Sequence, residues 1–273
     1  MKKLDAIHAQ RGLLLVALAL FTTTGLTQAE KVLPTPEQQA VINVDLAIPA
    51  DRPAIKMGNY TMLKGQPNPK FGNPQERFLS RHEAFLDRRK QPMDVLFIGD
   101  SITEAWQTTG AKVWKAGFAD RYNVANFGIS GDRTQHVLWR IENGELDGCS
   151  PKVVVLLIGT NNSAHNTPEE VAAGVTKIVG QIKTRIPSAN VVLLNLLPRA
   201  ANPSDPRREL VKQTNEIIAK LDNGKDVFFL ELWNQFLDDK GMLQIGLMPD
   251  GLHPSEAGYE IMAKIIQRKL AEL

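Results

Sequence analysis

A serine, a histidine and an aspartate stand where they could form a nucleophile and its base. Ser101 follows Gly-Asp directly after a short apolar run, and Asp250 precedes His253 by three residues. A serine hydroxyl is a weak nucleophile and needs an adjacent base that is held in place by a third group. Asp-x-x-His fits a single turn, in which the carboxylate accepts the imidazole Nδ1–H and leaves Nε2 free to take the serine proton. The spacing therefore predicts acyl chemistry by Ser101, His253 and Asp250.

Glycines follow three of the apolar runs at once. Gly99, Gly128 and Gly159 each stand where a run ends, and the carboxamides of Asn161 and Asn162 follow the third glycine closely. Glycine allows a tight turn and a close approach of the backbone to a ligand. Loops that combine free N–H groups with carboxamides suit a developing oxyanion. We expect the donors of the site in these loops.

The apolar runs alternate with segments of helical periodicity. The runs cover residues 95–98, 122–127, 153–158, 191–194 and 227–230, and the clearest helical segments cover 168–186, 207–221 and 255–273. Such alternation is typical of a parallel sheet buried on both faces. It predicts an α/β fold, a three-layer doubly wound sheet of about five parallel strands. Ligands of such sheets bind beyond the carboxyl ends of the strands, where the serine and the glycines stand.

This constellation resembles the GDSL, or SGNH, hydrolase family from about residue 74 to the C-terminus. The resemblance implies a flavodoxin-like fold and a carboxylic ester hydrolase of acetylesterase or lipase-like type. It assigns Ser101 as nucleophile and Asp250 with His253 as the closing Asp-x-x-His. It also implies an oxyanion hole formed by the N–H groups of Ser101 and Gly128 and the side-chain amide of Asn161.

Within that family the sequence is most similar to the catalytic subunits of platelet-activating factor acetylhydrolase. The likeness lies in Asn-Phe-Gly-Ile-Ser-Gly-Asp at 126–132, Asn-Gly-Glu-Leu at 143–146 and Leu-Leu-Pro-Arg at 196–199. It implies a short acyl group, acetyl above all, and a homodimer. Two positions depart from the family pattern, since Ile102 replaces a leucine and Asn162 replaces an aspartate found in many members. Neither position carries the proton or the oxyanion.

Four further residues are candidate substrate contacts. Asp132 and Arg133 follow the second glycine loop, and we interpret them first as charges that fix the loop and second as substrate contacts. His165 either lines the pocket or is solvated, and it is the competitor of His253 as base, although no carboxylate precedes it closely. Arg199 follows the fourth run and lies either at the rim of the site or in solvent.

The first 73 residues do not belong to the predicted domain of residues 74–273. A basic start, an apolar run at 13–21 and small or polar residues up to Ala29 form a secretory signal, with cleavage after about Ala29. Nine apolar residues fall short of the ~20 that span a bilayer, so no stable membrane span is expected after processing. Residues 30–73 are rich in proline and predict an irregular N-terminal arm. We expect a bacterial protein that is periplasmic or secreted.

Composition excludes several other classes of protein. The formal charge of +2 comes from residues 1–29, so the remainder is neutral and nucleic acid is not expected as a partner. A single cysteine, Cys149, excludes a disulfide framework and a thiolate zinc site. No histidines have metal-ligand spacing, and no nucleotide-binding glycine motif follows the first run. We therefore expect neither a metal nor another cofactor.

The sequence predicts a secreted serine esterase that cleaves short-chain esters. Because the protein carries an export signal, an O-acetylated carbohydrate is the first choice of substrate. A phospholipid or lysophospholipid of the platelet-activating factor type is the alternative within the same chemistry. A non-catalytic carbohydrate-binding protein of the cell envelope is the alternative from another class.

Overall fold

The structure is a computed structural model that describes residues 74–273. The predicted signal peptide, residues 1–29, and the predicted arm, residues 30–73, lie outside the described residues. The first described helix begins at Pro74. None of the described helices is long and apolar enough to cross a bilayer.

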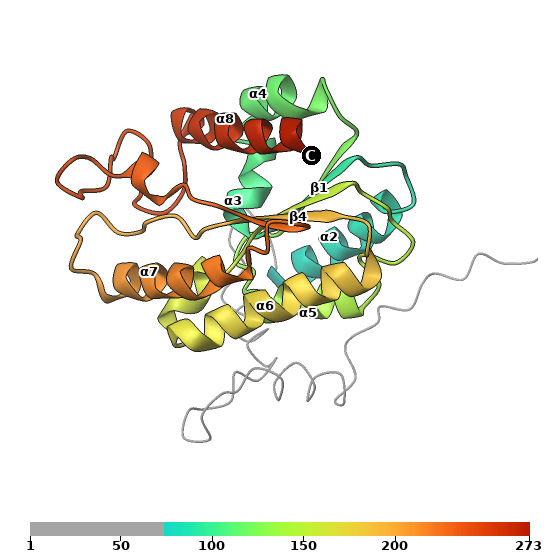
Figure 1. Cartoon of the computed structure of the whole chain (residues 1–273), viewed down its shortest axis with the longest axis horizontal. Coiled ribbons are helices and arrows are strands. Elements are labelled where there is room, and N and C mark those ends of the chain that lie inside the picture. Colours follow the sequence, from blue (N-terminus) through green and yellow to red (C-terminus); the bar gives the residue numbers. More distant parts are fainter. Residues whose placement is uncertain (1–73) are drawn as a thin grey trace, which may run out of the picture. The chain divides into compact units, whose positions relative to one another are not determined.

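Five parallel strands form one sheet, which confirms the predicted fold class (Figure 1). The strands are β1 (Val95–Gly99), β2 (Val124–Gly128), β3 (Val153–Leu157), β4 (Asn190–Leu194) and β5 (Val227–Leu230). Their order across the sheet is β2-β1-β3-β4-β5. The chain therefore leaves β1 for one neighbour and returns to the other side of β1 with β3. Ligands of doubly wound sheets bind at such a reversal, beyond the carboxyl ends of the strands, which here is the end of β1.

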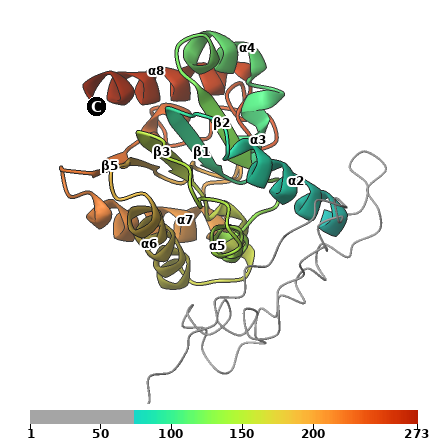
Figure 2. The same cartoon turned by 90° about the vertical axis from the view of Figure 1, so that its right-hand side faces the viewer.

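Helices cover both faces of the sheet, as Figures 1 and 2 show. One side carries α5 (Thr134–Glu142), α6 (Pro168–Arg185) and α7 (Pro206–Ile218), and the other carries α4 (Ala111–Trp114) and α8 (Glu256–Glu272). The remaining elements are α2 (Pro74–Arg88), α3 (Ser101–Glu104) and the short turns η2 (Ala105–Gln107), η3 (Lys115–Ala119), η4 (Thr160–Ala164), η5 (Ala219–Leu221) and η6 (Trp233–Phe236). The three predicted helices are confirmed, although the last turn of the second is the 3₁₀ turn η5.

Local sequence signals explain where the long helices begin. Thr167 caps α6 by accepting the N–H of Glu170, whose carboxylate accepts the N–H of Thr167 in return. Asp205 caps α7 ahead of Pro206, and Ser255 caps α8. These caps satisfy N–H groups that have no partner within the helix.

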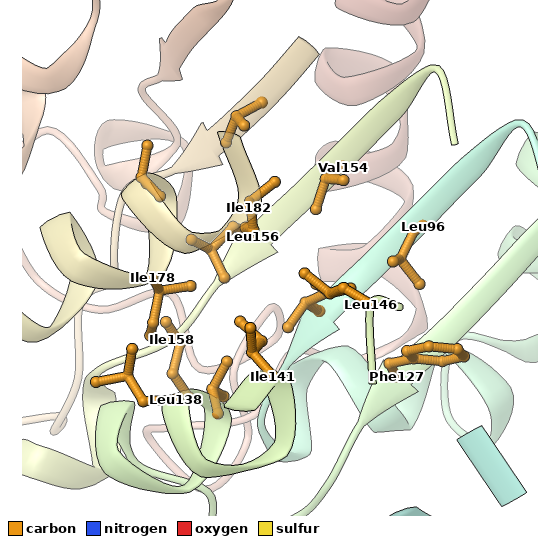
Figure 3. Close-up of a cluster of buried hydrophobic side chains, with 14 of the residues drawn as sticks. Leu96, Phe127, Leu138, Ile141, Leu146, Val154, Leu156, Ile158, Ile178 and Ile182 are labelled. Carbon is orange, nitrogen blue, oxygen red and sulfur yellow. The ribbon is translucent and has the colours of Figure 1, made fainter. Parts of the chain in front are cut away.

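Alternate residues of each strand enter two separate cores. Leu96, Ile98, Val154 and Leu156 pack with side chains of α5 and α6 in the cluster shown in Figure 3. The intervening residues, such as Phe97, face the cluster that contains α8. Side chains alternate between the faces of a strand, so a strand buried on both faces reads as a continuous apolar run. This explains the unbroken runs in the sequence.

Candidate active site

Ser101 lies at the first position of α3, directly beyond the end of β1. The buried carboxylate of Asp100 caps this short helix, and its Oδ1 accepts the N–H of Ile102 at 3.0 Å. Gly99 is required before it, because a Cβ there would lie 2.2 Å from the backbone oxygen of Leu157 and from the hydroxyl of Thr103. The Ser101 N–H is thus one of the N–H groups at a helix start that lack a partner within the helix.

His253 reaches Ser101 from the loop before α8. Its Nε2 lies 2.9 Å from Ser101 Oγ, and its Nδ1 lies 2.6 Å from Asp250 Oδ2. Asp250 Oδ1 also accepts the backbone N–H groups of Leu252 at 2.9 Å and His253 at 2.7 Å. The three side chains therefore form a continuous chain of contacts from carboxylate to hydroxyl, with Nε2 facing the serine.

The Asp250 carboxylate is suited to remain ionised. Partial burial opposes its charge, but hydrogen bonds from the ring and backbone N–H groups of His253 and from Leu252 outweigh it and hold the pKa below its usual range. An ionised Asp250 favours the tautomer of His253 that carries its proton on Nδ1. That tautomer presents a lone pair on Nε2 to Ser101.

The loop after β3 brings Asn161 to the same edge of the sheet. Asn161 Nδ2 donates to the backbone oxygen of Asp132 at 2.9 Å, which joins this loop to the one after β2. A carboxamide nitrogen carries two N–H donors, so this contact orients the group and uses one of them. Arg199 also holds this loop, since its Nη1 donates to Thr160 O at 2.7 Å and to Ser163 Oγ at 2.6 Å.

Asn162 connects the loop after β3 with the start of α5 through a buried network. Its Oδ1 accepts the N–H of Thr134 at 3.1 Å, and its Nδ2 lies within 3.1 Å of oxygens of Thr134, Gln135 and Asn166. The residue is 1% exposed. The departure from aspartate thus supplies a carboxamide that both accepts and donates, with a role inside the protein.

The sequence assigns the Gly128 N–H to the oxyanion hole, but this N–H already has a partner inside the protein. It donates to Asn126 Oδ1 at 2.9 Å. The residue pairs with Gly99 at the end of β2, and a Cβ on it would lie 2.3 Å from the Glu104 backbone nitrogen. Gly128 therefore serves the close packing of α3 on β2, and its assignment to an oxyanion hole is corrected.

Gly131 has the free donor that the prediction sought at Gly128. The neighbouring N–H groups are used, because Ile129 donates to Gly99 O, Ser130 to Glu104 and Asp132 to Ile129 O. The Gly131 N–H has no acceptor among residues 74–273. This glycine is exposed at φ +86°, and the space beside its Cα is open. The signal in the sequence is a second glycine after the strand, since the glycine at the strand end itself belongs to the sheet.

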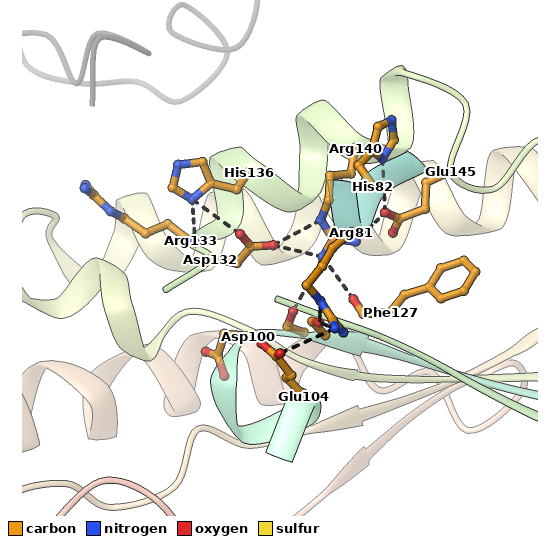
Figure 4. Close-up of polar contacts among 12 residues, drawn as sticks. Arg81, His82, Asp100, Glu104, Phe127, Asp132, Arg133, His136, Arg140 and Glu145 are labelled. Carbon is orange, nitrogen blue, oxygen red and sulfur yellow. Dashed lines mark hydrogen bonds and ion pairs between the residues drawn. The ribbon is translucent and has the colours of Figure 1, made fainter. Parts of the chain in front are cut away.

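Asp132 is buried, and its side chain points at Arg140 (Figure 4). Arg140 Nε donates to Asp132 Oδ2 at 3.0 Å, and the same guanidinium contacts Glu145 and the backbone oxygens of Phe127 and Gly99. Burial raises the pKa of Asp132 to about 8 although Arg140 opposes the shift, because two buried carboxylates share one guanidinium. The contacts of the Asp132 side chain favour the loop-fixing role over a substrate contact.

Arg133 and His165 differ in their surroundings. Arg133 is 3% exposed, and burial lowers its pKa. Its backbone N–H donates to Nδ1 of His136, a buried histidine whose pKa burial lowers to about 3 and which is therefore neutral. His165 is exposed at the end of η4, and burial together with the Arg133 charge lowers its pKa. The contact with Ser101 Oγ is made by His253.

The described residues contain no group of three or more His, Cys, Asp and Glu side chains that could hold a metal ion. Cys149 is buried, and burial raises the pKa of its thiol to about 11. The thiol is therefore protonated at neutral pH.

A doubly wound sheet with a serine, a histidine and an aspartate in contact at its edge is an arrangement found in serine-type hydrolases. The model of the GDSL-like Lipase/Acylhydrolase family matches residues 97–261. The chain belongs to this family, and it is a carboxylic ester hydrolase. Membership speaks against the non-catalytic alternative that the sequence left open.

Named relatives agree with this assignment. The platelet-activating factor acetylhydrolase IB subunit alpha2 of Rattus norvegicus is 39% identical over 184 residues, which are 67% of this chain and 78% of the relative. The human subunit alpha1 is 39% identical over 188 residues, covering 68% and 79%. These subunits confirm the resemblance that the sequence motifs indicated.

Two solved structures share the fold. A GDSL-like lipase from Bacteroides thetaiotaomicron superposes with a TM-score of 0.55 at 24% identity, covering 72% of this chain and 97% of the other. An acetylxylan esterase from Geobacillus stearothermophilus gives a TM-score of 0.53 at 22% identity, covering 64% and 93%. At these identities the likeness concerns the fold.

Proposed function

We propose that the protein is an exported serine esterase that removes short acyl groups, chiefly acetyl, from O-acetylated carbohydrate. The 2.9 Å contact between Ser101 Oγ and His253 Nε2, with Asp250 behind the ring, carries this proposal. No group beyond these side chains is required to activate the hydroxyl. We assign Ser101 as nucleophile, His253 as general base and acid, and Asp250 as the residue that orients His253.

The reaction follows from this geometry in two halves. His253 Nε2 takes the proton of Ser101 as Oγ attacks the ester carbonyl, and the electron pair of the carbonyl bond moves onto its oxygen. The oxyanion then re-forms the carbonyl, the ester C–O bond breaks, and the leaving alcohol oxygen takes the proton from the imidazolium, so that Ser101 is left acylated. Water attacks the acyl-enzyme along the same route, with His253 again as base, and releases the carboxylic acid.

The oxyanion is assigned three donors from three loops. The Ser101 N–H at the start of α3, the Gly131 N–H and the second N–H of Asn161 Nδ2 are available for this role. Gly131 replaces Gly128 in the set because the Gly128 N–H is bound to Asn126. Preorganised donors of this kind lower the barrier most where charge develops during the reaction.

We propose a short acyl group because the names of similar proteins specify acetyl. Relatives at 39% identity are acetylhydrolase subunits, and one structural neighbour is an acetylxylan esterase. A carbohydrate ester fits the proposed export, which rests on the signal pattern of residues 1–29. N-terminal sequencing of the protein from an exporting host tests that export. A mature chain that begins near Glu30 supports it, and an intact Met1 in the cytoplasmic fraction contradicts it.

A phospholipid or lysophospholipid ester is the second candidate substrate. It is favoured by the 39% identity to platelet-activating factor acetylhydrolase subunits. Hydrolysis rates on acetylated oligosaccharides and on acetylated and long-chain phospholipids separate the two candidates. A higher kcat/KM on the phospholipid would replace the first choice by the second.

The serine mechanism is tested with short-chain p-nitrophenyl esters. The Ser101→Ala variant should lose at least about 10⁴-fold in kcat while it keeps the circular dichroism spectrum of the wild type. Ser188→Ala, at an exposed serine outside the site, is the matched control and should keep full activity. Full activity in Ser101→Ala would exclude the proposed nucleophile.

A further inference from the structure

Glu104 closes the short helix that begins with Ser101, and its carboxylate crosses to the neighbouring loop. Glu104 Oε2 accepts the N–H of Ser130 at 2.7 Å. Its other oxygen faces the guanidinium groups of Arg77 and Arg81 on α2, and the contact with Arg81 is drawn in Figure 4. The side chain is 18% exposed, so these contacts lie largely out of solvent. One carboxylate thus links the nucleophile helix, the loop after β2 and α2.

Arg81 binds the same segment through a backbone oxygen. Its Nη2 and Nε donate to the backbone oxygen of Gly128 at 2.7 and 3.2 Å. Glu104 thus accepts the N–H of Ser130, and Arg81 donates to the carbonyl oxygen of Gly128, two residues earlier. Hydrogen bonds to charged groups are stronger than neutral ones, so this segment is held firmly on both sides.

The nucleophile helix and the loop are also in direct contact. The side chain of Asn126 donates to Thr103 O at 2.7 Å and accepts the Gly128 N–H at 2.9 Å. Space at Gly128 is so limited that a Cβ would lie 2.8 Å from Glu104 Cα. A shift of the loop would therefore be felt at α3, and Glu104 is the charged side chain of α3 that bridges them.

We propose that Glu104 is a positioning residue for ester hydrolysis, which sets the Gly131 N–H relative to Ser101 by holding the adjacent Ser130 N–H. The inference rests on the proposed function, because it concerns the donor assigned to the oxyanion. The N–H groups of Ser130 and Gly131 belong to consecutive peptide units, which meet at the Cα of Ser130. The hydrogen bond to the Ser130 N–H therefore restricts the direction of the Gly131 N–H. Donors must lie about 2.7–3.1 Å from the position of the developing oxyanion, and a 1 Å displacement costs up to about 10²-fold in rate.

A series of three substitutions separates reach from charge. Glu104→Gln keeps the length and an acceptor oxygen for Ser130 but loses the charge. Glu104→Asp keeps the charge but is one methylene too short, and Glu104→Ala loses both. We expect kcat on p-nitrophenyl acetate to fall about tenfold in the Asp and Ala variants, with KM nearly unchanged, and to fall less than about threefold in Glu104→Gln. An ion pair that only stabilised the fold predicts the reverse order, with Asp tolerated and Gln impaired.

Hydrogen exchange supplies a second readout at the loop itself. The peptide that contains residues 128–133 should exchange faster in the Asp and Ala variants and at the wild-type rate in Glu104→Gln, while β3 stays protected in all. Should Glu104→Ala fail to fold, the Asp and Gln pair still decides between the two orders. Glu272→Ala, which removes an exposed ion pair with Lys269 at the C-terminus, is the control for lost charge and should match the wild type.

Three results would overturn the proposal: the reverse order of Asp and Gln, a loss confined to KM, or unchanged kcat in all three variants. Ser101→Ala is measured in the same assay to distinguish this failure from failure of the proposed function. Activity that persists in Ser101→Ala overturns the serine mechanism itself. Activity that depends on Ser101 but ignores Glu104 overturns the positioning role alone.

Discussion

The two halves of the candidate site are held by different means. Ser101 and the loop after β2 are fixed by buried polar side chains, including Arg140, which is fully buried, and Asp132, which is 2% exposed. Asp250 and His253 are held within one turn of chain, and their side chains are 56% and 39% exposed. One half depends on tertiary packing, and the other depends on hydrogen bonds between residues three positions apart.

The difference corresponds to what each half does in the proposed reaction. Backbone donors cannot adjust their own position, so the loops that carry them need rigid support. An imidazole that first takes a proton and then delivers it needs beside it a carboxylate that stays ionised and orients the ring. Substitutions in the two halves should therefore separate loss of chemistry from loss of stability.

The largest effect is expected at the base. His253→Ala should lower kcat/KM on p-nitrophenyl acetate by about 10⁴-fold or more, because Ser101 loses its proton acceptor. His165→Ala should retain kcat, since the ring in contact with Ser101 Oγ is that of His253. Steady-state kinetics of both variants decide the assignment. An active His253→Ala with an inactive His165→Ala would exchange the two roles.

The next effect is expected at the side-chain donor. Asn161→Ala should lower kcat by about 10²–10³-fold with little change in KM, as for other single oxyanion donors. Its fold should persist, because Arg199 and Asn162 hold the loop independently of the Asn161 side chain. A loss seen in KM alone would mean that Asn161 binds the substrate in its ground state.

Substitutions around the loop after β2 should lower the free energy of unfolding more than substitutions in the Asp250–His253 turn. Arg140→Met leaves Asp132 and Glu145 buried without their cation and should lower the free energy of unfolding by about 3–5 kcal/mol. Asp250→Ala removes a half-exposed carboxylate and should cost less than about 1 kcal/mol. Urea denaturation of both variants provides the measurement. Equal losses would show that the two halves are held alike.

The smallest effect concerns the pH dependence of stability. Burial raises the pKa of Asp100 to about 7, although its bond from Ile102 and the charge of His253 oppose the shift. Between about pH 4 and 7 the folded protein holds a proton that the unfolded chain has released, so this group makes stability fall as pH rises through that window. Asp100→Asn should remove this contribution, so that Tm falls less between pH 5 and pH 8 than in the wild type, at about 2–4 °C per kcal/mol for a domain of this size. Thermal scans at pH 5 and pH 8 give the change in Tm for both proteins. The same change in the wild type and in Asp100→Asn would contradict the raised pKa.

Local signals predicted most of the fold. Apolar runs gave the five strands within two residues, because strands buried on both faces are continuous in sequence. The residues Thr167, Asp205 and Ser255 mark the starts of the helices that they cap. Asp250 and His253 are three residues apart, so their contact is a property of one turn.

The donors of the loop after β2 were only partly predictable. Gly128 and Gly131 have the same chemistry in sequence, and both follow an apolar run. Their difference arises because Gly128 pairs with Gly99 and gives its N–H to Asn126, whereas Gly131 lies beyond the sheet. Arg140 lies in an apolar helical stretch that carries no sign of its contacts with Asp132 and with the ends of β1 and β2.

The sequence by itself determined the strands, the helix caps, the place of Ser101 and the Asp250–His253 turn, because each depends on residues within a few positions. Only the tertiary structure decided which glycine N–H is free, where Asp132 points and how Glu104 joins two loops. Those features depend on which strands are neighbours and on side chains from α2 and α5 that the chain brings back to the sheet. Burial then makes such contacts strong, since an unpaired charge or N–H inside the protein is costly.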